Sequence, residues 1–271
     1  MIRQESDAGC HSVKKLCDFL GVSRATYCRK INFKPSKRAL ERDLLDELVL
    51  RIYHESDRIY GAGKIHYLLT QKYQEYRKIS MKRVQKSMQR QSIQSITIKK
   101  FKAGKSSKKV LENYKNLLNH DFSTTGLNQK WVADITYIHT LEHGWCYLST
   151  VMDLHSRKII GYHFNKKMET DIVINALEDA VLNRKLPTNC ILHTDLGSQY
   201  TLTAPYDNAG IESFHASLKK EHVYQRPTYS TFEEAKIQML SYVQGFYNTR
   251  RIHSTLAYLT PSQFEQHLLS A

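Results

Sequence analysis

The chain has 271 residues, of which 41% are hydrophobic, enough for one or two buried cores with some small modules. Lys and Arg outnumber Asp and Glu by 40 to 26, which gives a net charge of +14. Folding does not require such an excess. It raises the local concentration of polyanions, so nucleic acid is the leading partner and an acidic membrane surface comes second.

Nothing in the sequence indicates a membrane or secreted protein. The longest apolar runs are far too short to cross a bilayer, and the N-terminus, MIRQESDAGC, has no apolar signal segment. The cysteines are odd in number and contain no Cys-x-x-Cys pair, which argues against a zinc site or a disulfide framework. They are Cys10, Cys17, Cys28, Cys146 and Cys190. A reducing cytoplasm is the expected compartment.

The N-terminal segment, residues 1–33, predicts a helix-turn-helix. In SVKKLCDFLGVSRATYCRKI (12–31), apolar residues recur at helical spacing, Gly21 interrupts the helix, and Ser23 can cap a second one. The second helix would present three basic side chains to DNA: Arg24, Arg29 and Lys30. An ordinary helical hairpin with a solvated basic face is the alternative.

Residues 41–93 predict a second helical module of winged-helix or helix-turn-helix type. The stretch LLDELVLRIYHES is amphipathic, DRIYGAGKI contains a turn, and GKIHYLLTQKY is helical again. Ser80 can cap a further helix, MKRVQKSMQRQ, which has Val84 and Met88 on one face and basic side chains around the rest.

Residues 94–125 predict an extended basic linker. The part ITIKKFKAGKSSKKVLENYKN carries seven lysines against one acid, and like charges this dense oppose compaction. Such a segment can lie along DNA phosphates. A disordered linker that does not bind is the alternative.

From Gly126 onward the pattern predicts an α/β fold. The order is strand, strand, strand, helix, strand, helix, over residues 129–140, 145–155, 157–165, 170–183, 189–195 and 208–223. Three consecutive strands favour an antiparallel meander, and a strand after a crossover helix favours a parallel addition. We therefore expect a mixed β-sheet flanked by helices, in which the first and fourth strands are neighbours.

Three acidic residues occupy informative positions in this pattern. Asp134 lies within the first strand, Asp195 at the C-terminal end of the fourth, and Glu212 in the first turns of the following helix. A carboxylate inside an apolar strand is costly, and clustered carboxylates repel one another unless a cation sits between them. Mg²⁺ takes such oxygen ligands, and two ions can activate a nucleophilic oxygen and stabilise the leaving one. Surface carboxylates or helix caps are the alternative.

Several long blocks resemble one family in the right order: WVADITYI, YLSTVMDLHSRKIIGYHF, HTDLGSQYT, DNAGIESFHASLKKE and YNTRRIHSTLAYLTPSQFE. They are similar to the DDE transposases of insertion sequences, in particular the IS-three group, whose catalytic core is similar to retroviral integrase. LCDFLGVSRATY, YGAGKIHYLL and ISMKRVQKSMQ also resemble helix-turn-helix segments of that family. The resemblance therefore covers nearly the whole chain.

The resemblance implies an RNase H-like integrase core over residues 126–225 and a helical tail over residues 226–271. The residues that match the family's metal-binding catalytic triad, for two Mg²⁺ or Mn²⁺ ions, are Asp134, Asp195 and Glu212, and Lys219 matches a basic position near DNA. The implied reaction is metal-assisted attack of water, then of a 3′-hydroxyl, on DNA phosphodiesters. It implies a prokaryotic, nucleoid-associated homo-oligomer on double-stranded DNA, at the element ends and at the target.

Other polar residues in these blocks have structural interpretations that we favour. Asp153 and Arg157 bracket a turn between strands, so a structural pair is expected. His193 precedes Asp195 by two residues and would share its face of the sheet. Two roles stay open for three residues of the tail, contact with DNA or docking of the tail on the core: Arg250, Arg251 and His253.

The interval between the second and third acids is short. From Asp195 to Glu212 is 212 − 195 = 17 steps, roughly half of what the family has. In the family fold this interval holds a helix and a fifth, edge strand, whereas LGSQYTLTAPY predicts only a loop. We expect an internal deletion that exposes the fourth strand as an edge and loosens the helix that carries Glu212. Whether the chain is catalytically active is therefore left open.

Two further functions also stay open. A catalytically inactive DNA-binding protein, a regulator or remnant of a mobile element, would use the helical modules and the basic linker alone. A different RNase H-like nuclease would act on RNA or structured DNA without specific terminal repeats. A metabolic enzyme finds no support, because the sequence has neither a glycine-rich nucleotide loop nor a nucleophile elbow.

Overall fold

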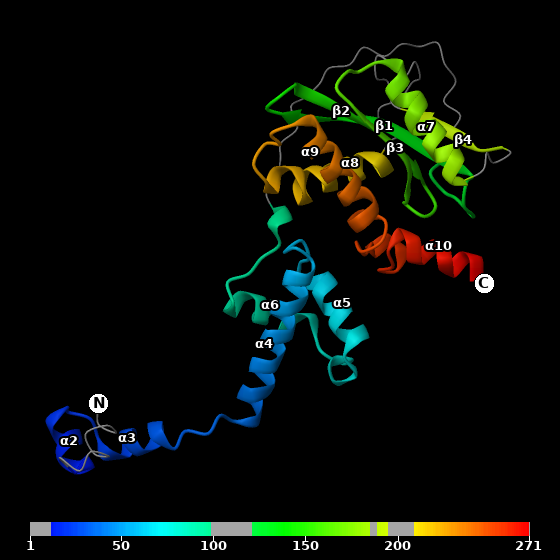
Figure 1. Cartoon of the computed structure of the whole chain (residues 1–271). Helices are drawn as coiled ribbons and strands as arrows, with labels where there is room; N and C mark the ends of the chain where they lie inside the picture. Colours follow the sequence, from blue (N-terminus) through cyan, green and yellow to red (C-terminus); the bar gives the residue numbers. More distant parts are fainter. Residues whose placement is uncertain (1–11, 99–120, 185–188, 195–208, 271) are drawn as a thin grey trace.

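The structure of the protein is a computed structural model that describes four stretches of the chain: residues 12–98, 121–184, 189–194 and 209–270. Its main elements are α2 (Val13–Phe19), α3 (Arg24–Ile31), α4 (Lys37–Glu55), α5 (Ala62–Lys72), α6 (Met81–Arg90), β1 (Lys130–Thr140), β2 (Gly144–Asp153), β3 (Ile159–Asn165), α7 (Thr170–Arg184), β4 (Ile191–Thr194), α8 (Ala209–Glu221), α9 (Phe232–Leu240) and α10 (Pro261–Ser270). Shorter segments are the 3₁₀ turns η1 (Gln74–Tyr76), η2 (Ile96–Ile98), η3 (Val223–Gln225) and η5 (Ser254–Leu256), and a π-helical segment η4 (Ser241–Tyr247). The N-terminal half is helical and the sheet belongs to the C-terminal half (Figure 1).

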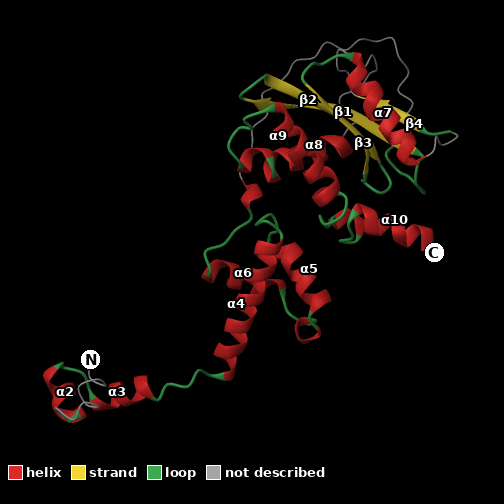
Figure 2. Ribbon diagram, viewed as in Figure 1, coloured by secondary structure: helices red, strands yellow, loops and turns green. Residues whose placement is uncertain are grey.

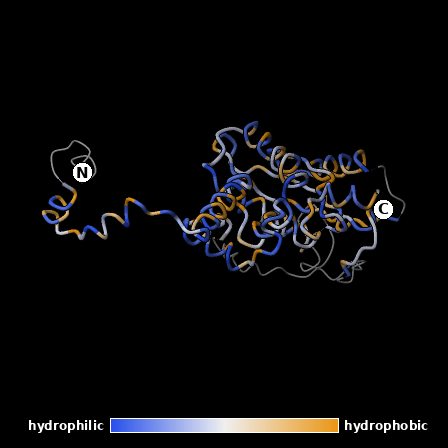
Figure 3. Tube along the Cα trace, turned by 90° about the horizontal axis from the view of Figure 1, so that it is seen from below, coloured by the Kyte–Doolittle hydropathy of each residue, from blue (hydrophilic) through white to orange (hydrophobic). Residues whose placement is uncertain are grey.

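The first two helices, α2 and α3, form a pair with little core of its own. Each begins after a serine, Ser12 or Ser23, whose side chain accepts a hydrogen bond from a backbone N–H of the first turn. Gly21 between them has a φ of +63°, a left-handed conformation that favours glycine. Cys17 is the one buried residue of the two helices. The two predicted helices and the glycine turn between them are present, and Figure 3 shows the pair standing away from the rest of the molecule.

Helices α4, α5 and α6 pack into a second module that has a core. Its most deeply buried side chains come from all three helices: Leu45, Val49, Ile52, Ile65, Leu69 and Val84. Asp46 of α4 accepts hydrogen bonds from Ser87 Oγ at 2.6 Å and Arg90 Nε at 3.0 Å, and so ties α6 to α4. Ser80 is the N-cap residue of α6, as predicted, but its side chain makes no capping hydrogen bond. The buried face of α6 and its contacts with Asp46 therefore hold the helix in place.

The four strands form one mixed sheet in the order β3-β2-β1-β4. The pairs β1–β2 and β2–β3 are antiparallel, and β4 is added parallel to β1, with Val132 opposite His193 and Ala133 opposite Thr194. The predicted meander with a parallel fourth strand beside the first is confirmed. Within the described part of the chain, β4 lies at the edge of the sheet, as predicted.

Alternation along β1 gives the sheet two different apolar faces. Odd-numbered side chains such as Trp131 pack in the cluster that includes α7, and even-numbered ones such as Val132 and Ile138 pack in the larger core with α8 and α9. Gly161 of β3 lies so close to α7 that a Cβ there would be 2.2 Å from the carbonyl oxygen of Ala176. Helices therefore cover both faces (Figure 2), the RNase H-like α/β arrangement that the sequence predicts.

The C-terminal tail is docked on the core by buried charge pairs. Arg251 donates from Nε and Nη2 to the two carboxylate oxygens of Glu221 in α8, at 2.8 and 2.7 Å. Glu265 of α10 pairs with Lys158 at 2.9 Å and also with Arg184. Of the tail residues whose role the sequence left open, Arg251 thus has a docking role.

Asp153 has the structural role predicted for it, but with other partners. It is fully buried and accepts hydrogen bonds from the backbone N–H groups of Asn128 and His155, each at 2.8 Å. Burial raises its pKa. The carboxylate is therefore held by backbone donors of the surrounding turns rather than by Arg157.

Most of the basic linker predicted over 94–125, namely residues 99–120, and the whole of the predicted loop LGSQYTLTAPY (196–206) lie outside the described residues. Among the helices that the structure does describe, none combines the length and the apolar character that crossing a bilayer requires.

Candidate active site

Asp134 lies near the middle of β1, on the face covered by α8. It is opposite Thr150 of β2, and its side chain is 23% exposed. Its Oδ1 accepts a hydrogen bond from the backbone N–H of Ile135 at 2.8 Å, and its Oδ2 lies 3.2 Å from Nδ1 of His215. The acid is therefore held from two sides while part of its carboxylate still faces solvent.

His215, which the sequence patterns did not single out, contacts the first predicted acid. It lies in α8, is buried, and reaches two strands, because its Nδ1 contacts Asp134 and its Nε2 lies 2.9 Å from Oγ1 of Thr150. An ionised carboxylate only accepts, so Nδ1 is the donor to Asp134, and a neutral ring then accepts from the Thr150 hydroxyl at Nε2. A histidine three residues after Glu212 on the predicted helix is the signal that points to it.

Helix α8 is packed firmly against the sheet. Ile211, Phe214 and Leu218 on its apolar face are at most 1% exposed. Gly210 allows the start of the helix to approach the turn that follows β2, since a Cβ there would be 2.9 Å from the side chain of Leu154. The expectation of a loosened helix is therefore wrong, because β1 and the C-terminal helices supply the core in which α8 is buried.

Glu212 lies in the first turn of α8, one turn before His215, and it is exposed. Side chains three residues apart on a helix are neighbours. Because His215 contacts Asp134, Glu212 projects from α8 next to the side that meets β1. The structure therefore brings the helix of the predicted third acid onto the strand of the first.

Asp195 lies outside the described residues. Strand β4 ends at Thr194, which is opposite Ala133 of β1. His193 pairs with Val132, so it shares the α8 face of the sheet, and it is buried. In the described stretches, no three His, Cys, Asp or Glu side chains gather closely enough to hold a metal ion. Those stretches contain two of the three predicted acids.

The predicted DNA-binding residues lie in two separate places. Lys219 is in α8, one turn after His215, and is half-buried. Burial lowers the pKa of Lys219, and the nearby carboxylate of Asp134 opposes that shift. The other three are exposed on α3 of the N-terminal pair: Arg24, Arg29 and Lys30. One cation thus lies beside the acid, and a basic helix lies apart from it.

The donor atoms at Asp134 suit a hard divalent cation. Each carboxylate oxygen has two lone pairs, and those of Asp134 engage one contact each, with Ile135 and with His215. The remaining lone pairs, together with the exposed carboxylate of Glu212, are ligands of the type that Mg²⁺ and Mn²⁺ take. Asp134 and Glu212 therefore fit as metal ligands.

Comparison with family models identifies the class of protein. Residues 125–230 match the Integrase core domain, and residues 212–269 match a second model with the same description. Residues 40–101 match an HTH-like domain. Together with the mixed sheet, these matches define an RNase H-like core of the integrase type combined with an HTH-like module.

Two relatives specify the family. Transposase InsF for insertion sequence IS3A of Escherichia coli (strain K12) is 34% identical, over 96% of this chain and 96% of its own length. The transposase for insertion sequence element IS904 of Lactococcus lactis subsp. lactis (strain IL1403) is 32% identical, over 86% of this chain and 98% of its own length. The chain belongs to the IS3 family of insertion-sequence transposases. Membership of this family implies DNA binding and dependence on a divalent metal.

The alignment with InsF spans 282 positions, more than the 271 residues of the chain, so InsF has residues for which this chain has no counterpart. An internal deletion produces such a difference.

A solved structure, the simian T-cell lymphotropic virus intasome in complex with PP2A regulatory subunit B56 gamma, is similar over 51% of this chain and 54% of that chain, with 15% identity and a TM-score of 0.38. A likeness at this level carries no further conclusion.

Proposed function

We propose that the protein is a DDE transposase that cleaves DNA at the ends of its insertion sequence and transfers the cut ends to target DNA. The observation that carries the proposal is the place of Asp134, in an interior strand of the sheet and under the helix that carries Glu212. A carboxylate at such a place can hold a divalent cation against a scissile phosphate. Membership of the transposase family supports the same activity.

The sheet register supports Asp195 as the second acid. Thr194, the residue before Asp195, pairs with Ala133, the residue before Asp134, in a parallel ladder. The described end of β4 thus lies next to the strand position of the first acid. We therefore infer that Asp195 is the second acid and Glu212 the third.

The proposed roles of the residues differ. Asp134, Asp195 and Glu212 hold two Mg²⁺ or Mn²⁺ ions, which when bound supply an activated nucleophile and stabilise charge on the leaving oxygen. His215 orients the carboxylate of Asp134 through Nδ1 and is itself fixed by its hydrogen bond to β2. Lys219 binds a DNA phosphate next to the acids.

The proposed reaction consists of two displacements at phosphorus. Water attacks a phosphodiester at the end of the element, and the bond between phosphorus and the 3′-oxygen breaks, which leaves a 3′-hydroxyl and a 5′-phosphate. That 3′-hydroxyl then attacks a target phosphodiester, and a target 3′-hydroxyl leaves. Neither step forms a bond to the protein. Because an element has two ends, we infer that a homo-oligomer on double-stranded DNA provides one site for each.

A strand-cleavage assay tests the proposal. End-labelled duplexes with the terminal repeats of the element are incubated with the full chain and Mg²⁺ or Mn²⁺. We expect nicks that leave 3′-hydroxyls, and loss of nicking with DNA binding retained in Asp134→Asn and in Glu212→Gln. Nicking that persists in Asp134→Asn would show that the acid has another role.

The short interval from Asp195 to Glu212 favours a second candidate, a catalytically inactive DNA-binding regulator that competes with a full-length relative. This candidate predicts salt-sensitive DNA binding that Asp134→Ala leaves unchanged. A version of the chain lengthened in that interval to the length of its relatives separates the two functions. Nicking by the lengthened chain alone supports the regulator, and nicking by both chains supports the active transposase.

A further inference from the structure

An aromatic cluster projects from the end of the β1–β2 hairpin. We call Tyr137 and His139 of β1 together with Trp145 and Tyr147 of β2 the hairpin patch. Tyr137 is directly opposite Tyr147, and His139 is opposite Trp145, so all four side chains share one face of the sheet. Trp145 is 60% exposed and Tyr137 is 47% exposed. Large aromatic surfaces this open on a folded chain mark interaction sites.

The rings of the hairpin patch meet edge to face. The Tyr137 and Trp145 rings are inclined by 83° with centroids 6.5 Å apart, and the His139 and Trp145 rings by 85° with centroids 5.0 Å apart. In an edge-to-face contact only one of the two rings uses its face. The patch therefore keeps flat apolar ring surfaces available, and nucleobases stack on such surfaces.

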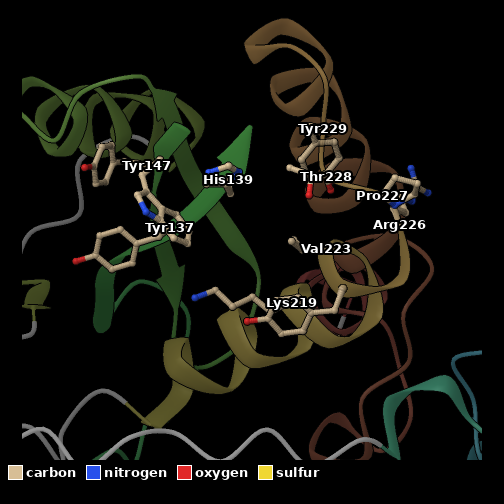
Figure 4. A pocket seen from close by; sticks show the side chains of 11 residues that line it. Tyr137, His139, Tyr147, Lys219, Val223, Arg226, Pro227, Thr228 and Tyr229 are labelled. Carbon is tan, nitrogen blue, oxygen red and sulfur yellow. The ribbon is translucent and has the colours of Figure 1, made fainter. Parts of the chain in front are cut away.

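The hairpin patch forms one wall of a cavity of about 710 Å³. Helix α8 and the segment from η3 to Tyr229 form the other walls, and Lys219 and Arg226 contribute two cations (Figure 4). Among the described residues that line this cavity, none is acidic. A lining of aromatic rings and cations suits an anionic ligand with flat apolar parts, which is the character of a nucleotide strand.

The cavity adjoins the candidate active site. Lys219 lines the cavity and lies one turn of α8 after His215, whose Nδ1 is 3.2 Å from Asp134 Oδ2. Tyr137 follows Asp134 by three residues on β1, about 10 Å along the strand, and its side chain leaves the opposite face of the strand. Lys219, from the α8 side, and the hairpin patch line the same cavity. A DNA strand with its phosphate at Asp134 would therefore pass Lys219 before its next nucleotides reach the hairpin patch.

We propose that the hairpin patch binds unpaired nucleobases of the DNA strand beside the scissile phosphate. The bases stack on Trp145 and Tyr137, while Lys219 and Arg226 hold the phosphates of the same strand. This inference rests on the proposed function. Paired bases inside a duplex are stacked on one another, so their faces are not free to meet the patch. The absence of acidic side chains from the described lining, together with the net charge of +14, favours a polyanion over an apolar protein segment.

Tryptophan fluorescence tests the proposal directly. The chain has two tryptophans, and Trp131 is 2% exposed, so Trp145 is the one that a ligand in the cavity can reach. A short oligothymidylate is titrated without divalent metal into the Asp134→Asn chain, so that catalysis plays no part. We expect quenching of the emission that the further change Trp145→Phe removes, while binding followed by anisotropy of a labelled oligothymidylate is largely kept by the phenyl ring.

Alanine variants give the size of the effect. Trp145→Ala and Tyr137→Ala should each weaken oligothymidylate binding by roughly 5- to 100-fold, the usual loss when a base-stacking ring is removed. Leu182→Ala, which removes an apolar side chain that is 82% exposed on α7, is the matched control and should bind as the parent does. Circular dichroism of each variant establishes that it is folded.

Three results would overturn the proposal. In the first, a blunt duplex without unpaired bases quenches Trp145 as strongly as oligothymidylate does. In the second, folded Trp145→Ala binds oligothymidylate like the parent. In the third, Trp145→Ala changes the oligomeric state and leaves DNA binding intact, so the patch faces a second copy of the chain. Failure of the proposed function appears separately, as a parent chain that binds oligothymidylate but does not nick terminal-repeat DNA.

Discussion

Two charged clusters lie on the same helix, α8, and they differ in how completely their groups are satisfied. At the middle of the helix, His215 meets Asp134 of β1, which is 23% exposed and keeps lone pairs unused. At its end, Glu221 is 5% exposed, receives two hydrogen bonds from Arg251 and a third from the hydroxyl of Tyr242 at 2.9 Å. The first cluster, Asp134 with His215, is open to a cation. The second, Glu221 with Arg251 and Tyr242, has no free position for one, and we call it the closed cluster.

The difference indicates which charges serve chemistry and which serve folding. A buried ion pair with every group satisfied holds its elements together, and removal of one partner leaves the other charged and desolvated. A carboxylate that still touches water keeps much of its hydration and can exchange that water for a metal ion. We therefore expect changes at the first cluster to affect activity, and changes at the second to affect stability.

The largest expected effect is that of Asp134→Asn on strand cleavage. Loss of the carboxylate removes a metal ligand, so the cleavage rate should fall by at least about 10³-fold, or about 4 kcal/mol in the barrier. The thermal midpoint should change little, because the side chain is partly exposed. Asp171→Asn, at an exposed acid of α7, is the control and should cleave like the parent. A large drop in the thermal unfolding midpoint of Asp134→Asn would show that this acid stabilises the fold, as the Glu221–Arg251 pair does.

Arg251→Ala should produce the largest loss of stability. It leaves Glu221 buried without its cation, which costs about 3–5 kcal/mol in the free energy of unfolding. Urea denaturation measures this cost. Arg250→Ala, at the exposed neighbouring arginine, should change the free energy by about 0.5 kcal/mol or less. Unchanged stability together with weaker DNA binding in Arg251→Ala would mean that the tail contacts DNA through this residue.

His215→Ala should have an intermediate effect on activity. A group that orients a metal ligand typically contributes about 10- to 100-fold to metal affinity or rate. Half-maximal cleavage should therefore require more Mg²⁺ in this variant, which a purely structural role would not produce. His215→Asn keeps an N–H donor near the position of Nδ1 and should recover part of the loss. Equal Mg²⁺ dependence in all three chains would contradict the orienting role.

The smallest expected effect is on pH dependence near the closed cluster. Burial and the nearby cations Arg251, Lys64 and Arg157 lower the pKa of His253 to about 3, from an ordinary value of 6.5. The pKa of His253 is lower in the folded chain than in the unfolded chain, so between about pH 3 and pH 6.5 the unfolded chain binds more protons. The free energy of unfolding therefore decreases as pH falls from about 6.5 toward 3. Thermal unfolding at about pH 7.5 and about pH 5 measures the loss.

His253→Asn should show a smaller drop between the two pH values than the parent does. It should not abolish the drop, because burial also lowers the pKa of His222 to about 4. An identical drop in parent and variant would show that His253 does not contribute.

The sequence alone was sufficient for the parts of the protein that follow local patterns. Strand alternation and helical spacing predict the order of elements from β1 to α8, and the crossover helix α7 makes β4 parallel to β1. The pattern of elements placed Asp134 in the first strand and Glu212 in the last helix, and the resemblance to the transposase family then singled them out as metal ligands; the structure puts them on β1 and α8. These patterns are sufficient because the periodicity of a helix or a strand determines which neighbouring positions in the sequence are apolar and which are polar.

Only the tertiary structure decided which side chains meet across those elements. His215 contacts Asp134 over 81 residues, and Arg251 binds Glu221 over 30. The helix that carries Glu212 is firmly docked although the interval before it is short, because its apolar face is buried by β1 and the tail. Contacts between residues so far apart depend on how the elements pack in three dimensions, and packing leaves no periodic signal in the residues on either side.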